Sequence, residues 1–217
     1  MNFKVLFMDS NQEHLDALRD IKQMMERSSR FISLSGLSGI AAGACALAAS
    51  VYTWRLLASR KAYGEDYRQL AFETGDSLKM QLLTIGGITF IAALLLAFFF
   101  TYTRSLKNGT PIWGITARRL LWNTMVPMIV GGIVVLRLLQ AGLAGLIAPT
   151  CLLFYGLALI NGSKYTLPEV RWLGYCQLIL GIINLWMIGY GLIFWAIGFG
   201  ILHIVYGAMM WWRYERQ

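Results

Sequence analysis

The sequence predicts an all-α, polytopic membrane protein: a six-transmembrane-helix bundle preceded by a short N-terminal amphipathic cytoplasmic helix. Hydrophobic residues make up 57 % of the chain and charged residues only 14 %, whereas soluble domains average about half and about a quarter. The charged residues concentrate in residues 1–30, 55–79 and 104–119. The long apolar stretches outside these segments predict membrane spans, and no polar stretch is long enough for a separate soluble domain.

A membrane helix needs about 20 apolar residues, because each residue rises ~1.5 Å and the hydrocarbon layer is ~30 Å thick. The chain then divides into a cytoplasmic segment (residues 1–30), a transmembrane domain (31–212) and a cytoplasmic tail (213–217). The six predicted spans are residues 31–54, 80–102, 120–139, 143–160, 170–188 and 192–212. Residues 140–142 and 189–191 are the only links within the last two pairs of spans. Each pair must therefore form a tight helical hairpin, with glycine in the turn.

The distribution of Lys and Arg predicts that both termini are cytoplasmic. With the N-terminus inside, the cytoplasmic segments carry more than twice as many Lys and Arg residues as the opposite side, as the positive-inside rule requires. The first external loop, residues 55–79, is also basic and competes with the N-terminal segment. The net charge of +8 follows from this asymmetry, and nucleic acid is not predicted as a partner.

Small residues follow one face of the first predicted span. Ser35, Gly39 and Gly43 recur every fourth residue, and such a strip allows two helix backbones to approach closely. We therefore expect this span to pack against another helix. The pattern leaves open whether that helix belongs to the same chain or to a second copy in a homo-oligomer.

Four polar side chains inside the predicted spans are candidates to line a polar pathway: Asn123, Gln177, Asn184 and His203. A fifth, Arg137, lies near the end of the third span, where its long stem can carry the guanidinium group to the interface. Polar groups within a membrane are costly, so they often mark a function. The alternative is that they form hydrogen bonds between helices and only hold the bundle together. An imidazole facing lipid would be unsatisfied, and Gln177 matches His203 in depth within the last hairpin. We expect His203 to face the bundle and to bond to Gln177.

Residues 13–30 predict an amphipathic helix that lies in the cytoplasm. Leu15, Leu18, Ile21 and Met25 recur every three or four residues, with charged residues on the other faces. Such a helix can lie on the lipid surface or pack against the bundle. Alternatively, its apolar stripe docks a soluble cytoplasmic partner.

The spans offer no catalytic group that would indicate an enzyme. They contain no Asp or Glu, so proton-coupled and sodium-coupled transport lose support and His203 has no carboxylate partner. Cys45, Cys151 and Cys176 all lie in apolar runs, where cysteine packs as a small apolar residue. No metal site and no cofactor are predicted.

The junction before the first span carries one resemblance. Residues 24–39, with the sequence MMERSSRFISLSGLSG, resemble the N-terminal block of a family of bacterial multi-pass inner-membrane proteins. The resemblance implies a bacterial inner membrane as the location of this chain. It brings no activity and assigns no site.

Two functions fit these observations. The first is a small-solute transporter or channel-like protein whose pathway is lined by the four polar side chains. The second is a non-transporting membrane scaffold or signalling subunit that binds a cytoplasmic partner through its N-terminal helix. A water-filled lumen at mid-membrane depth would favour the first function, and a dry, filled bundle would favour the second.

The predicted topology can be checked by labelling single cysteines in intact cells, in a variant without the three native cysteines. We expect a membrane-impermeant reagent to label position 64 but not positions 108 or 161, because only the first of these lies outside. Labelling at position 108 or 161 would overturn the orientation.

Overall fold

A computed structural model of the chain describes residues 35–61, 76–107, 109 and 112–216. Every regular element in this part of the chain is a helix, so the predicted all-helical architecture is confirmed. The N-terminal amphipathic helix, with Leu15, Leu18, Ile21 and Met25, lies outside the described residues.

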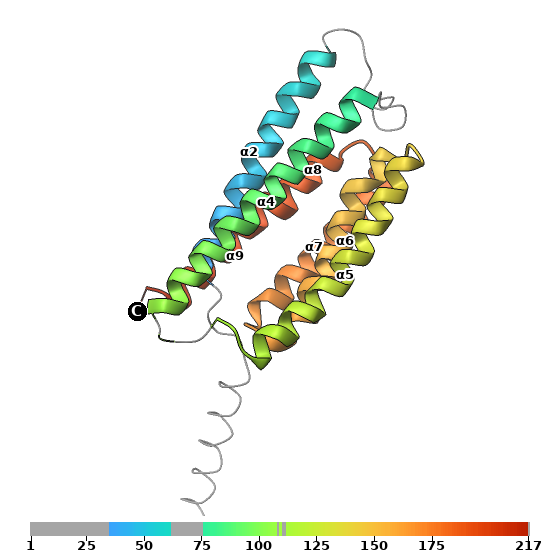
Figure 1. The fold of residues 1–217 in the computed structure, drawn as a ribbon. Coiled ribbons are helices and arrows are strands. Elements are labelled where there is room, and N and C mark those ends of the chain that lie inside the picture. Colours follow the sequence, from blue (N-terminus) through green and yellow to red (C-terminus); the bar gives the residue numbers. More distant parts are fainter. Residues whose placement is uncertain (1–34, 62–75, 108, 110–111, 217) are drawn as a thin grey trace, which may run out of the picture.

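Six long helical segments follow one another (Figure 1). The first five are α2 (Gly36–Lys61), α4 (Asp76–Lys107), α5 (Ile115–Gln140), α6 (Ile147–Gly162) and α7 (Glu169–Trp186). The sixth, which we call the last segment, joins α8 (Gly191–Trp195), the π-helix η3 (Ala196–Leu202) and α9 (His203–Tyr214) without a break. Short 3-10 turns, η1 (Ala144–Leu146) and η2 (Ser163–Tyr165), flank α6.

Five of these six segments are long and apolar enough to cross a membrane; α7 is the exception. Its sequence includes Glu169, Arg171, Gln177 and Asn184, which lower its hydropathy. Each of the six predicted spans overlaps one of the helical segments. Pro149 lies in the first turn of α6, where the missing N–H has no partner to lose.

The helices form two groups of three (Figure 1). In one group, α2 packs against both α4 and the last segment; in the other, α6 packs between α5 and α7. The last segment also contacts α6 and α7. It is therefore the element that joins the two groups.

Glycines make the two predicted tight turns. Gly142, between α5 and η1, has a φ of 75°, and Gly189, between α7 and α8, has a φ of 103°. Residues other than glycine rarely adopt these left-handed backbone conformations. The chain can therefore reverse within a few residues at both hairpins.

The small residues of α2 pack against the last segment of the same chain. A Cβ on Gly39 would lie 3.1 Å from Gly207 Cα, and a Cβ on Gly43 would lie 2.7 Å from the carbonyl oxygen of Gly200. In the opposite direction, a Cβ on Gly207 would lie 2.6 Å from the backbone nitrogen of Ile40. The two backbones thus touch where both helices carry glycine. Ser35 precedes α2 and has a different, polar role, described below.

We expect Gly207→Ala to destabilise the protein by about 1–3 kcal/mol or more, because the new methyl group collides with backbone that cannot rotate away. Gly87→Ala is the matched control, since a Cβ at that position meets nothing within 4 Å. Thermal unfolding in detergent, followed by a fluorophore that reacts with newly exposed cysteines, measures both variants. Equal melting temperatures for the two would contradict this account of the α2 contact.

Candidate polar site between the two helix groups

A buried polar cluster lies where the last segment meets α6 and α7. The carbonyl oxygen of Gly198 accepts one hydrogen bond from Gln177 Nε2 at 2.8 Å and another from His203 Nδ1 at 2.9 Å. Gln177 is 0 % exposed and His203 is 8 % exposed. One backbone atom of the last segment therefore binds side chains from both α7 and α9.

The second nitrogen of the His203 ring bonds to α6. Its Nε2 lies 2.8 Å from the hydroxyl oxygen of Tyr155. A carbonyl can only accept, so Nδ1 carries the proton that is donated to Gly198. In the neutral imidazole Nε2 is then the acceptor, and the Tyr155 hydroxyl donates to it. Both polar atoms of the buried ring are satisfied in this way.

Aromatic rings enclose the hydrogen-bonded atoms. The Tyr155 ring centroid lies 5.4 Å from that of His203 and 5.1 Å from that of Phe199. Trp195 extends the group, with its ring 5.3 Å from Phe199. These distances are typical of packed aromatic pairs. The polar atoms consequently have apolar surroundings, in which hydrogen bonds are strong and unmade bonds are costly.

The backbone conformation around Gly198 explains why its carbonyl oxygen can accept two hydrogen bonds. The π-helix η3 replaces the regular i→i+4 ladder over Ala196–Leu202, and such widened turns often occur at functional sites. A Cβ on Gly198 would lie 2.5 Å from Leu152 Cδ2 and 2.6 Å from Gln177 Oε1. Only glycine leaves room for the two neighbours to reach this backbone.

His203 faces the bundle, as expected, but the prediction that it bonds directly to Gln177 is wrong. The two side chains share the Gly198 carbonyl instead. The side chain that bonds to the ring is Tyr155, which the sequence analysis did not consider. Tyr155 lies within the predicted span 143–160, and its hydroxyl could have marked it in the sequence as a hydrogen-bond partner for another polar side chain.

The other two candidate residues lie apart from this cluster. Asn184 is 0 % exposed, seven residues or roughly 10 Å beyond Gln177 along α7, and its Nδ2 donates to the Met187 carbonyl at 3.2 Å. Asn123 donates to the Arg119 carbonyl of its own helix at 2.8 Å. Of the four candidates, only Gln177 and His203 are therefore brought together, at the Gly198 carbonyl.

Gln177, Asn184 and His203 line neither of two hollows on the surface of the described residues. One lies at the amino end of α5, and the other lies between α2 and the first half of the last segment. Oε1 of Gln177 and Oδ1 of Asn184 have no hydrogen-bond partner among the described residues. The polar cluster is closed, with packed side chains around it.

A second polar contact holds the ends of three helices together. Glu215, just after α9, accepts hydrogen bonds from the Ser35 hydroxyl at 3.2 Å and from the backbone N–H of Gly36. The same carboxylate pairs with the buried guanidinium of Arg104 at 3.0 Å. It thus caps the first turn of α2 and ties that turn to the end of α4.

A third contact joins α7 to α9 at the same end. Glu169 Oε1 accepts from Arg213 Nη1 at 3.0 Å and from the Tyr214 hydroxyl at 2.9 Å. Glu169 is buried although it begins α7. Glu169 and Glu215 were not among the predicted site residues, because both lie just outside the predicted spans.

No group of three or more His, Cys, Asp or Glu side chains that could hold a metal ion occurs within the part of the chain that the structure describes. Cys45, Cys151 and Cys176 are free thiols. The polar cluster itself offers an imidazole, a phenol and an amide, which are already bonded to one another or to Gly198.

No family model, no curated protein and no solved structure matches the chain. The resemblance of residues 24–39 to bacterial multi-pass proteins stays an expectation.

The pair formed by Tyr155 and His203 can be tested with a double-mutant cycle. Tyr155→Phe should destabilise the protein by about 1–3 kcal/mol, because it leaves a buried ring nitrogen without its partner. In the double variant with His203→Phe, the loss should be smaller than the sum of the single losses by about 0.5–1.7 kcal/mol. Additive losses in thermal or denaturant unfolding would show that the two side chains do not interact.

Proposed function

We propose that the chain is a polytopic protein of the bacterial inner membrane, with six transmembrane helices and both termini in the cytoplasm. Large apolar side chains on the outer faces of the helices support a lipid environment, since soluble proteins rarely expose large apolar patches. Along the middle of α4 the exposed side chains include Ile88, Phe90, Ile91, Leu94, Leu95, Phe98 and Phe99.

α7 completes the six spans despite its polar residues. Glu169, Gln177 and Asn184 are all buried against neighbouring helices, whereas Ile179 and Ile182 are exposed. A helix with polar groups toward the bundle and apolar groups outward suits a membrane span.

The proposed orientation is supported by the charges at the two ends of the bundle. Ser35 and Glu215 are bonded to each other, so the start of α2 and the end of α9 share one end. The described basic side chains gather at that end: Arg104, Lys107, Arg118, Arg119, Lys164, Arg171, Arg213 and Arg216. Arg55 and Arg137 lie at the opposite end. Excess positive charge on one side identifies that side as cytoplasmic.

Within the membrane the protein acts, in this proposal, as a non-conducting scaffold or signalling subunit. The closed polar cluster is the observation that carries this choice. Gln177 and His203 form bonds between helices, as packing glue does, and line neither of the two hollows. The functional surface is then the cytoplasmic segment, with residues 13–30 docking a partner protein. The bond between Ser35 and Glu215 holds the start of α2, a few residues after that segment in the sequence.

A transporter is the second candidate, and the position of η3 favours it. Secondary transporters bind substrate near mid-membrane, between two helix groups and beside an interrupted helix. Here η3 lies in the last segment, which belongs to one group of three helices and contacts the other. A rocking motion that separated the groups would break the bonds that Tyr155 makes to His203 and Gln177 makes to Gly198, and would open a polar passage.

Accessibility of position 177 to water separates the two candidates. In a variant without native cysteines, Gln177→Cys in proteoliposomes should not react with a small water-soluble thiol reagent, because a packed bundle excludes water. Arg216→Cys, at an exposed position, gives the reactive reference, and Gly87→Cys gives the reference for a lipid-facing site. Reaction at position 177 at a rate near that of position 216 would reject the scaffold in favour of a transport pathway.

A further inference from the structure

A shallow hollow lies on the outer face of the bundle at the amino end of α5. Its lining residues are Ile115, Arg118, Arg119, Trp122 and Asn123. This end of the bundle is the one that also holds Glu215 and Glu169, through the contacts described above. The hollow combines two cations, an indole and an alkyl side chain within two turns of one helix.

The two arginines are exposed and have no ion-pair partner among the described residues. Two other basic side chains at this end are engaged in ion pairs. Arg104 pairs with Glu215, and Arg213 pairs with Glu169. Arg118 and Arg119 thus present two adjacent positive charges and no described acid to balance them.

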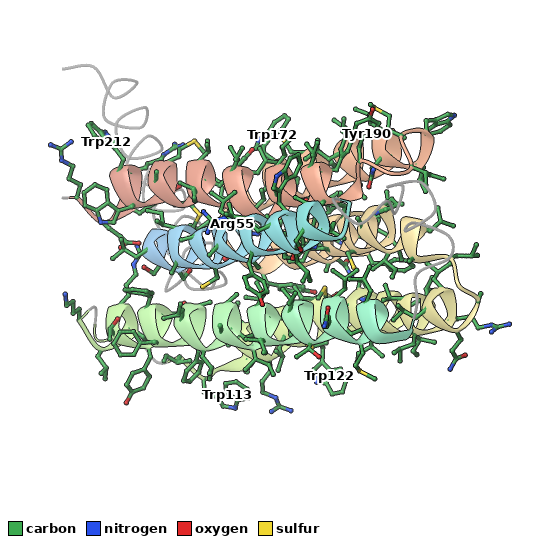
Figure 2. The ribbon with its side chains drawn as sticks, turned by 90° about the horizontal axis from the view of Figure 1, so that it is seen from above. Arg55, Trp113, Trp122, Trp172, Tyr190 and Trp212 are labelled. Carbon is green, nitrogen blue, oxygen red and sulfur yellow. The ribbon has the colours of Figure 1, made fainter. Side chains whose placement is uncertain are left out.

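Two indoles, of Trp113 and Trp122, lie on either side of these arginines in the sequence, and both point away from the bundle (Figure 2). Trp122 is 66 % exposed and Trp113 is 67 % exposed. An indole has a large apolar body and one N–H donor, so it favours the headgroup layer of a bilayer. Their exposure at the level of the arginines fits the depth at which lipid phosphates lie.

An apolar track leads from this hollow along α5. Trp122, Val126, Ile129, Ile133 and Leu136 are all exposed, and their spacing of four and three residues places them on one face. From position 122 to position 136 the helix rises roughly 21 Å, more than the ~15 Å of one leaflet. Because the face is longer than one leaflet is thick, a lipid acyl chain can lie against it over the full length of the acyl chain.

We propose that Arg118, Arg119 and Trp122 form a binding site for an anionic phospholipid of the surrounding bilayer. The phosphate accepts hydrogen bonds from the two guanidinium groups, and one acyl chain packs along the exposed face of α5. The proposal depends on the membrane location given under "Proposed function" and holds for either candidate function.

The chemistry selects a lipid over other anions and an anionic lipid over a zwitterionic one. A free phosphate or an acidic peptide would use the arginines but not the apolar track below them. A zwitterionic headgroup brings a cationic amine next to two guanidinium groups, with no described carboxylate to receive it. A net negative headgroup with an acyl chain matches both parts of the site.

Native mass spectrometry of the full chain in mild detergent provides the test, with phosphatidylglycerol and phosphatidylcholine added in turn. We expect the chain to retain phosphatidylglycerol preferentially. Arg118→Gln with Arg119→Gln should weaken that retention at least about tenfold, the effect expected when about 1.4 kcal/mol of charge-assisted hydrogen bonding is lost. Trp122→Ala should weaken it by a smaller factor.

The control is Arg55→Gln with Arg137→Gln, which removes the same charge from exposed positions at the opposite end. This control should leave retention unchanged. Equal loss in both double variants would mean that only overall charge matters, and would overturn the site. Equal retention of the two lipids by the unmodified chain, or displacement of phosphatidylglycerol by equimolar inorganic phosphate, would also overturn it.

A separate measurement distinguishes failure of this site from failure of the membrane proposal. Cell membranes that contain the unmodified chain are washed with alkaline carbonate. Retention in the pellet together with lost lipid preference rejects only the lipid site. Release into the supernatant rejects the membrane location and the lipid site together. Melting temperatures within a few degrees of the unmodified chain show that the arginine variants remain folded.

Discussion

The carbonyl oxygen of Gly198 is the atom on which the joining of the two helix groups depends. It lies in the last segment, yet it receives hydrogen bonds from Gln177 of α7 and from His203, whose ring is held by Tyr155 of α6. A side chain at position 198 would fill the space that Leu152 and Gln177 occupy. The absence of a Cβ at position 198 and the π turn therefore have the same effect. Both give side chains access to a single backbone oxygen.

The opposite face of the same segment meets a different requirement. Gly200 and Gly207 bring its backbone against Leu47 and Gly36 of α2. Lipid tails are as apolar as leucine, so hydrophobic burial does little to associate helices within a membrane, and close packing and hydrogen bonds take its place. The last segment supplies packing on one face and hydrogen bonds on the other. The carboxylates of Glu169 and Glu215 add charged contacts at one end of the bundle.

The parts of this fold that depend on length and local chemistry could be predicted from the sequence. Apolar run lengths indicated six helices, and the glycines between spans indicated the two tight turns at Gly142 and Gly189. The inward direction of His203 followed from the cost of an unsatisfied ring. The hydrogen-bond partner of His203 could not be predicted in the same way. The π turn changes which side chains can reach the Gly198 carbonyl, and no residue pattern specifies that turn. Glu215 was also out of reach, since its partners are 180 and 111 residues away in sequence.

Three buried side-chain oxygens lack a hydrogen-bond donor among the described residues: Oε2 of Glu169, Oε1 of Gln177 and Oδ1 of Asn184. Each such atom costs about 1–3 kcal/mol. Two of them, Oε1 of Gln177 and Oδ1 of Asn184, lie where α7 meets the last segment. Both face glycines of the last segment, at positions 198 and 191. Any motion that moved α7 away from the last segment and admitted water would satisfy both oxygens. A scaffold therefore needs contacts that outweigh this gain. The bond between Glu169 of α7 and Arg213 of α9 opposes that separation directly, and the bond between Tyr155 and His203 holds the neighbouring helix α6 to the last segment.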